Sequence, residues 1–218
     1  MISHKWKFIF VHMYKTGGTS IREALKPFCS NWRMRLGGKI AMTLGHPSFS
    51  NKIYQHHVSA SELVQKIGEA RFRSYFSFAF VRNPWDWQVS LYTYMLKEKS
   101  HYQHELAKSF SGFDEYIEWR CAEEVRLQRD YLFSKDGRQL VDFVGRFENL
   151  EEDFGKICAR IGISAVLPKL NVTEHHPYQE FYTPRTENLV RRAFEADIKL
   201  FDYEFDRAAN RQRMLSAF

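Results

Sequence analysis

Cysteine is scarce in this chain, and its placement excludes two kinds of scaffold. The sequence has three cysteines in 218 residues, Cys29, Cys121 and Cys158, and no two of them form a C-x-x-C pair. An odd number at such wide spacing fits neither a disulfide framework nor a structural zinc site. We therefore expect three reduced thiols, no metal site and a cytoplasmic location.

Long hydrophobic runs are also absent. No apolar stretch approaches the roughly 20 residues that a helix needs to cross a bilayer. The first residues, 1–5, lead into an apolar run without the features of a signal peptide. The sequence therefore predicts a soluble protein that is not secreted and has no membrane span.

Charge of one sign is not gathered into blocks. The formal net charge is +6, yet lysine and arginine are spread along the chain. This balance favours an anionic partner, either nucleotide phosphates or an acidic polymer, and argues against a nucleic-acid-binding tail. No linker or repeat divides the sequence, so we expect a single domain over residues 1–218.

The chain does contain a regular alternation of apolar runs and helical patterns. Such alternation predicts a mainly parallel sheet covered on both faces, which is a three-layer α/β/α arrangement. Capping signals mark helix starts at Ser59, Asn83, Asn149 and Thr183. Strands are predicted in the apolar run from Lys7 and at 53–56, 75–81 and 141–147. Helices are predicted at 20–26 (ended by Pro27), 60–67, 84–97, 113–124 and 150–161, with a long last helix from Pro184 that includes Phe194 and Phe201.

The most informative segment joins the first predicted strand to the first predicted helix. It reads His12-Met13-Tyr14-Lys15-Thr16-Gly17-Gly18-Thr19-Ser20. A strand, a glycine turn and a helix start direct backbone N–H groups at one spot, and a lysine beside them makes an anion site. A plain connecting turn is the alternative interpretation, but the lysine and the hydroxyl residues together favour phosphate binding.

The order of these residues differs from that of an ATP- or GTP-binding loop. The Walker A pattern places its lysine after the glycines and a Ser or Thr on Mg²⁺, whereas Lys15 precedes Gly17 and Gly18. Lys15 is therefore expected at the carboxyl end of a strand, where ligands bind in open α/β sheets.

A second anion site is predicted where the strand at 75–81 ends. Arg82 follows this strand directly, and Ser90 lies about two helical turns later. A guanidinium can bind a phosphate bidentately, with a hydroxyl as an additional donor. The alternative is an ordinary arginine at a strand end that pairs with a neighbouring acid such as Asp86.

Together these motifs resemble the carbohydrate-type family of the sulfotransferase superfamily. The segment from His12 to Ser20 is similar to that family's loop for the 5′-phosphosulfate. The segment from Phe80 to Asp86, with Ser90 and Tyr92, is similar to its 3′-phosphate motif. The resemblance covers nearly the whole chain and extends to residues 57–60, 145–150, 167–171 and 197–203.

The resemblance implies a P-loop-like fold and the donor 3′-phosphoadenosine 5′-phosphosulfate (PAPS). Its sulfuryl group would pass in line to a hydroxyl, usually of a glycan, leaving adenosine 3′,5′-bisphosphate, with no metal required. Lys15 would stabilise charge on the bridging oxygen. Two positions depart from the family pattern, since Tyr14 stands where proline is usual and Trp87 where arginine is common. The residues expected to hold the donor are Lys15, Thr16, Gly17, Gly18, Thr19, Ser20, Arg82 and Ser90.

A sugar hydroxyl is a poor nucleophile and needs a base within hydrogen-bond reach. His57 is the first candidate because it precedes a capped helix and matches the family's histidine in that segment. A neutral histidine can accept a proton near pH 7. The alternative is a histidine that only caps or packs. His56 would point the other way in an extended segment, and His12 and His46 are weaker candidates.

Two further groups are given structural or ligand-binding interpretations. Arg146 and Glu148 are expected to form a structural pair at a strand end. The segment 175–182 is either a loop whose aromatic ring stacks on the adenine or a surface loop anchored by its aromatics. The core is expected to include Phe78, Phe80, Trp85 and Trp87.

Two hypotheses from other classes stand beside the sulfotransferase. A P-loop kinase would require Mg²⁺, ATP and an aspartate after an apolar strand, and Asp142 is a poor match because it lies inside its predicted strand. A non-catalytic module that binds polyanions would show steep salt dependence and no preference for a 3′-phosphate.

Overall fold

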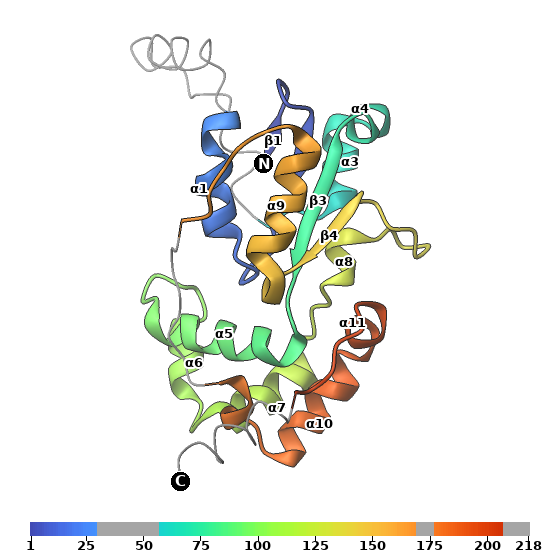
Figure 1. Ribbon diagram of the computed structural model, residues 1–218. Coiled ribbons are helices and arrows are strands. Elements are labelled where there is room, and N and C mark those ends of the chain that lie inside the picture. Colours follow the sequence, from blue (N-terminus) through green and yellow to red (C-terminus); the bar gives the residue numbers. More distant parts are fainter. Residues whose placement is uncertain (30–56, 169–176, 207–218) are drawn as a thin grey trace, which may run out of the picture. The chain divides into compact units, whose positions relative to one another are not determined.

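The computed structural model describes residues 1–29, 57–168 and 177–206 (Figure 1). Contacts between residues divide the chain into two compact units. The first unit comprises Met1–Val81 and Asp130–Asn171, and the second comprises Arg82–Arg129 and Val172–Phe218. That residues 1–218 form one domain stays a prediction.

The first unit contains a four-stranded sheet in the order β1-β2-β3-β4. These strands are β1 (Ile2–Ser3), β2 (Phe8–Phe10), β3 (Phe76–Val81) and β4 (Phe143–Arg146). The short β1 pairs antiparallel with β2, whereas β2 with β3 and β3 with β4 are parallel. The predicted mainly parallel sheet is therefore confirmed, and the carboxyl ends of β2, β3 and β4 share one edge.

The helices of the first unit alternate with these strands along the chain (Figure 1). This arrangement confirms the mixed α/β class, while the P-loop-like character stays a prediction. The helices are α1 (Gly18–Cys29), α3 (Ala60–Ile67), α4 (Glu69–Arg73) and α9 (Leu150–Ile161), with a 3₁₀ turn, η2 (Phe147–Asn149), before α9.

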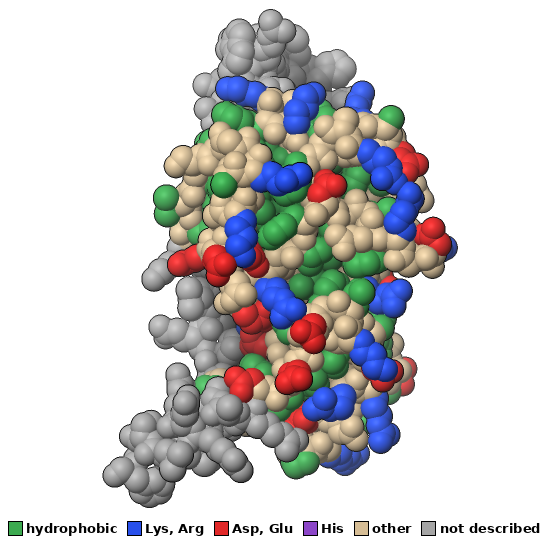
Figure 2. Space-filling model, turned by 45° about the vertical axis from the view of Figure 1, so that its right-hand side comes forward, with side chains coloured by type: hydrophobic (Ala, Val, Ile, Leu, Met, Phe, Trp, Pro, Cys, Tyr) green, Lys and Arg blue, Asp and Glu red, His purple; other side chains and the backbone are tan. Residues whose placement is uncertain are grey.

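Charged side chains of both signs are interspersed on the face of the molecule shown in Figure 2. Several surface charges pair within one helix, such as Lys26 with Glu23 at 3.3 Å and Lys199 with Glu195 at 2.7 Å. Exposed pairs of this kind contribute about 0–1 kcal/mol each, so packing and not charge pairing holds the elements in place.

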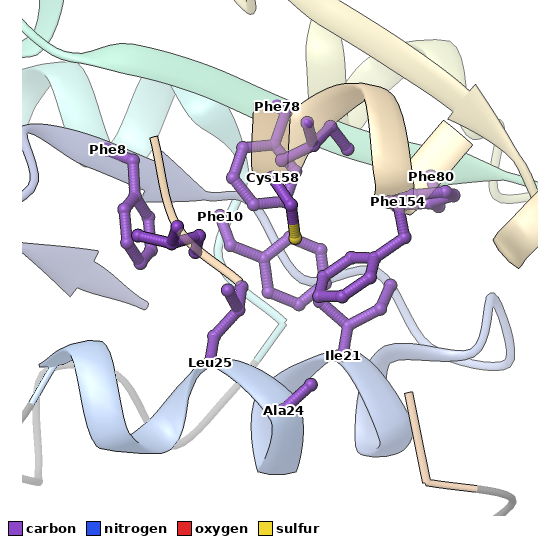
Figure 3. Close-up of a cluster of buried hydrophobic side chains, with 11 residues drawn as sticks. Phe8, Phe10, Ile21, Ala24, Leu25, Phe78, Phe80, Phe154 and Cys158 are labelled. Carbon is purple, nitrogen blue, oxygen red and sulfur yellow. The ribbon is translucent and has the colours of Figure 1, made fainter. Parts of the chain in front are cut away.

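The hydrophobic core of the first unit lies between the sheet and helices α1 and α9 (Figure 3). One face of β2 and β3 carries Phe8, Phe10, Phe78 and Phe80, because alternate side chains of a strand point to the same face. Fully burying one such side chain contributes about 1.5–3 kcal/mol. From the helices, the core receives Ile21, Ala24 and Leu25 of α1 and Phe154, Ile157 and Cys158 of α9.

Helix α1 differs from its prediction at both ends. It begins at Gly18 instead of Ser20 and continues past Pro27 to Cys29. Pro27 lies in the last turn, so the hydrogen bond that its missing N–H would have made is lost where the helix already ends. The earlier start has a functional consequence, because it places Gly18, Thr19 and Ser20 in the first helical turn.

The predicted strand at 141–147 is shorter in the structure, since β4 covers only Phe143–Arg146. Asp142 therefore precedes the strand and does not lie inside it. Its carboxylate Oδ2 accepts hydrogen bonds from the backbone N–H of Ser77 at 2.7 Å and from the Ser77 hydroxyl at 2.8 Å. Asp142 thus joins the amino-terminal ends of β3 and β4.

The second unit is helical in the residues described. Trp85 and Trp87 are fully buried there, as are Phe78 and Phe80 in the first unit, which confirms all four as core residues. The elements are α5 (Pro84–Lys97), α6 (His104–Ser109), α7 (Phe113–Glu123), η3 (Tyr178–Phe181), α10 (Pro184–Ala193) and α11 (Glu195–Leu200). Helix α8 (Arg129–Leu132) begins at Arg129 in the second unit, and its other residues belong to the first unit.

The long last helix predicted from Pro184 is divided into α10 and α11. Phe194 leaves helical geometry between them, with φ of −109° and ψ of 20°. Its fully buried ring packs edge-on against Trp87 at 6.4 Å between ring centroids. Tertiary packing outweighs helix propensity at this position.

The predicted helix caps are confirmed at three starts. Ser59 and Glu62 form a capping box, the Asn83 side chain accepts from the N–H of Trp85, and Thr183 caps α10. Asn149 precedes α9 as predicted, but its side chain makes no capping hydrogen bond.

The cysteines behave as the sequence predicts, since Cys29, Cys121 and Cys158 are all free thiols. Within the described ranges, no helix has both the length and the apolar character that a bilayer span requires.

Candidate functional site

The connection from β2 to α1 contains two residues in the left-handed region of backbone space. Lys15 has φ of 60° and Gly17 has φ of 77°. A side chain in this conformation costs roughly 1–2 kcal/mol per residue, whereas glycine adopts it freely. The unfavourable conformation therefore falls on Lys15, the residue that the sequence predicts to act on the ligand.

The amino terminus of α1 supplies backbone donors at the same place. The first helical hydrogen bond runs from the N–H of Ile21 to the carbonyl of Gly17 at 3.2 Å. The N–H groups of Gly18, Thr19 and Ser20 belong to the first helical turn, where the backbone donors point toward the amino-terminal end of the helix. The first turn carries no acidic residue. The positive end of the helix dipole, which lies there, therefore favours an anion.

Thr16 has a structural task inside this loop. Its hydroxyl donates to the carbonyl of Met13 at 3.0 Å, and the residue is fully buried. Because a hydroxyl has only one proton to donate, the side chain of Thr16 braces the turn. Any contact of Thr16 with a phosphate would therefore come from its backbone.

Both glycines of the loop are close to neighbouring side chains. A methyl group on Gly17 would lie 2.9 Å from Cδ2 of Leu150, at the start of α9. A methyl group on Gly18 would lie 2.0 Å from Cδ2 and from Nε2 of the His12 ring. Gly18 is thus required for close approach, and Gly17 for its backbone conformation.

His57 lies against the loop. Its Nδ1 is 3.3 Å from the backbone carbonyl oxygen of His12, and its ring packs edge-on against the rings of His12 at 4.7 Å and Tyr14 at 5.5 Å. A carbonyl oxygen can only accept, so Nδ1 carries the proton in this contact and Nε2 of neutral His57 carries the lone pair. Lys15, Gly18 and His57 are brought into one region of the first unit.

His12 is held neutral at this site. Burial, together with the nearby His57 and Arg22, lowers the pKa of His12 from 6.5 to about 3. A histidine with such a low pKa is a weak base near pH 7, which leaves His57 as the better candidate among the histidines that the structure describes.

Tyr131 is a member of this cluster that the sequence did not indicate. Its ring packs edge-on against Tyr14 at 6.3 Å. Tyr14 stands where the family that the chain resembles usually has proline. Its ring contacts the rings of both His57 and Tyr131. No local pattern could have found Tyr131, because its partner lies far away in the sequence.

Arg82 lies in the second unit, immediately after β3. Its Nε donates to Oδ2 of Asp86 at 2.7 Å, and both side chains are largely buried. The pairing with Asp86 that the structural interpretation expected is therefore present. Asp86 takes one of the five N–H donors of the guanidinium, so the pair orients Arg82 and does not by itself decide its ligand.

Ser90 and the aromatic residues near 180 also belong to the second unit. Ser90 is 1% exposed in α5. The Tyr182 hydroxyl donates to the carbonyl of Trp85 at 2.9 Å, and the Tyr182 and Phe181 rings pack edge-on against Phe113. These contacts agree with a loop anchored by its aromatics. The proposed stacking on an adenine stays a prediction.

The position of Asp142 bears on the kinase hypothesis. Asp142 joins the amino-terminal ends of its strands, whereas Lys15 follows the carboxyl end of β2. An aspartate at the opposite edge of the sheet is unsuited to hold Mg²⁺ beside that lysine. In the described part of the chain, no three His, Cys, Asp or Glu side chains gather as a metal site would require.

Several predictions fall outside the described residues. They are the strand at 53–56, the alternative bases His46 and His56, and those parts of the segments 167–171 and 175–182 that lie within 169–176.

Comparisons with known proteins agree with the motifs. The sequence model of the sulfotransferase family matches residues 1–204 of this chain. A protein of Archaeoglobus fulgidus, described only as uncharacterized, is 29% identical over 118 residues, which cover 53% of this chain and 92% of that protein.

Proposed function

Because the chain belongs to the sulfotransferase family, we propose that it transfers the sulfuryl group of PAPS to a hydroxyl of a carbohydrate, in the cytoplasm. The observation that carries this proposal is the loop after β2, where left-handed Lys15 adjoins the amino terminus of α1. Preorganised donors of this kind stabilise charge that develops as a bond to a phosphate oxygen breaks.

The residues of the first unit would bind the 5′ end of the donor, each with a different role. The backbone N–H groups of Gly18, Thr19 and Ser20 would hold the 5′-phosphate, and the Lys15 ammonium would neutralise the oxygen from which the sulfuryl group departs. PAPS supplies an activated sulfuryl group, and this transfer needs no metal in the proposal. The product would be adenosine 3′,5′-bisphosphate.

His57 would act as the general base. The carbonyl of His12 keeps the proton on Nδ1 of His57, so its Nε2 would take the proton of the acceptor hydroxyl as the new oxygen–sulfur bond forms. The hydroxyl proton thus ends on His57, and the electron pair of the broken bond remains on the nucleotide phosphate.

Arg82 and Ser90 would hold the 3′-phosphate, which distinguishes PAPS from ATP. The Asp86 carboxylate orients the Arg82 guanidinium through Nε. A charge-assisted contact with a phosphate is roughly twice as strong as a neutral hydrogen bond, so most of the discrimination is expected from Arg82.

Calorimetric titration separates this proposal from its alternatives. Adenosine 3′,5′-bisphosphate and ATP are each titrated with and without Mg²⁺. We expect tight binding of the bisphosphate alone, independent of Mg²⁺. Preference for Mg-ATP would favour a nucleotide-dependent kinase, and weak, strongly salt-dependent binding of both would favour the polyanion-binding module.

Two substitutions test the assigned roles. Arg82→Ala is expected to lose affinity for the bisphosphate, with the exposed Arg185→Ala as its matched control.

His57→Ala is expected to keep that affinity and lose turnover, measured with labelled PAPS and a panel of glycans and small alcohols. His4→Ala, at an exposed histidine of the same unit, is the control. Transfer by His57→Ala at the parent rate would show that another group is the base.

A further inference from the structure

The backbone of Arg82 is held by a buried side chain that no sequence motif indicated. The N–H of Arg82 donates to Oε1 of Gln128 at 2.9 Å, and Nε2 of Gln128 donates to the carbonyl of Arg82 at 2.8 Å. Gln128 is fully buried, and Arg82 is 5% exposed. One side-chain amide therefore pairs with both backbone groups of Arg82, as a neighbouring strand would.

Gln128 is itself fixed by a buried carboxylate. Oδ2 of Asp197, in α11, accepts from the N–H of Gln128 at 2.7 Å, and Oδ1 accepts from the N–H of Arg129 at 2.9 Å. Asp197 is fully buried. Hydrogen bonds to an ionised carboxylate are stronger than neutral ones, and losing one leaves a buried charge underpaired. The segment 128–129 is thus anchored to α11.

The two ends of Arg82 are therefore fixed independently. Gln128 holds its backbone, and Asp86 holds its guanidinium through Nε at 2.7 Å. Asn83 adds a third restraint next in the chain, because its side chain accepts from Trp85 and donates to the carbonyl of Glu204. A guanidinium fixed at both ends points in one direction before any ligand arrives.

We propose that Gln128, anchored by Asp197, is a positioning residue that aims the Arg82 guanidinium at the 3′-phosphate of the donor nucleotide. This inference rests on the proposed function of Arg82. Preorganised donors bind without paying the entropy of ordering, and a displacement of about 1 Å can reduce activity by about 100-fold. Gln128 acts through Arg82 and does not itself contact the nucleotide.

The test measures recognition of the 3′-phosphate separately from stability. Adenosine 3′,5′-bisphosphate and adenosine 5′-phosphate are titrated by calorimetry into the parent protein and Gln128→Met, and the ratio of the two dissociation constants is compared. We expect Gln128→Met to reduce the preference for the bisphosphate by about tenfold or more, with unchanged affinity for adenosine 5′-phosphate.

A double substitution and a matched control make the result specific. In an Arg82→Ala background, Gln128→Met should change the ratio no further. Gln88→Met is the control, because Gln88 is also fully buried in the second unit but accepts from the Tyr116 hydroxyl and from Nε of Arg120, each at 3.2 Å. An unchanged ratio in Gln128→Met, or an equal loss of both affinities, would overturn the proposal.

Hydrogen exchange of the Arg82 amide gives a measurement that does not depend on the nucleotide. Gln128→Met and Asp197→Asn should both speed this exchange relative to Gln88→Met, and unchanged exchange would contradict the role of Gln128. If the parent protein bound both nucleotides equally, the proposed function would fail. The exchange rates would then still decide whether Gln128 holds Arg82.

Discussion

Gly18 leaves little room for a side chain, because the His12 ring lies against it. We predict that Gly18→Ala destabilises the protein by about 1–3 kcal/mol, the usual cost of overpacking. In a His12→Ala background the clash is absent, so the same substitution should be neutral or stabilising by up to about 1 kcal/mol, as for glycine to alanine in a helix. Urea unfolding of the four proteins measures this coupling, and additive effects would contradict it.

The low pKa of His12 predicts a dependence of stability on pH. The folded protein keeps His12 neutral down to about pH 3, whereas the unfolded chain protonates it below about 6.5. The unfolded state therefore binds more protons in this window, and the free energy of unfolding should decrease as the pH falls from 6.5 toward 3. The contribution is at most about 1.4 kcal/mol per pH unit.

His12→Gln isolates this contribution, because carboxylates titrate alike in both proteins. The charged or titratable neighbours that lower the pKa of His12 are His57, Arg22 and the amino terminus, and all three remain in the variant. Urea unfolding between pH 4 and 8 should give a shallower slope for His12→Gln. Parallel curves would show that His12 titrates normally in the folded state.

Helix boundaries were predicted accurately where local sequence signals, such as capping residues, fix them. The helix at 60–67 and its Ser59 cap were predicted to the residue, as was the start of α5 at Pro84 after Asn83. The break at Phe194 was not, because it depends on packing against Trp87 and not on any local breaker. Helix ends that short-range hydrogen bonds fix can be predicted, whereas ends that distant contacts fix cannot.

The capping box of α3 offers a prediction for a whole element. The Ser59 hydroxyl accepts from the N–H of Glu62, and the Glu62 carboxylate accepts from the N–H of Ser59 at 2.7 Å, which lowers the pKa of Glu62. Ser59→Ala should reduce the free energy of unfolding by about 1 kcal/mol. Ser61→Ala, inside the same helix, should be neutral or slightly stabilising. Equal effects in chemical denaturation would show that the cap is unimportant.

For the whole molecule, the sequence predicted the α/β class and the free thiols. It missed Tyr131 and the pairing of Gln128 with Arg82, because side chains that meet across long stretches of sequence leave no periodic signal. It also placed Asp142 inside a strand, since apolar Val141 extends the run without joining the ladder.

The thiols give a prediction for the whole chain. Burial raises the pKa of Cys29 and of Cys121 to about 11 and also raises the pKa of Cys158. At pH 8 only about one thiol in a thousand at Cys29 and Cys121 is then ionised, and the thiolate is the reactive form. A colourimetric disulfide reagent should label native protein slowly and all three cysteines rapidly in urea. Rapid labelling of native protein would contradict this prediction.

The parallel pairing of β2 with β3 also has a consequence for how the chain is made. Phe8 pairs with Phe76, and Phe78 with Phe143, so the parallel partner of β2 and that of β3 are synthesised long after the strands that they join. Synthesis proceeds at about 5–20 residues per second. The phenylalanine-rich β2 is therefore without its partner β3 for several seconds. Chaperone supply during expression should therefore affect the yield of active material.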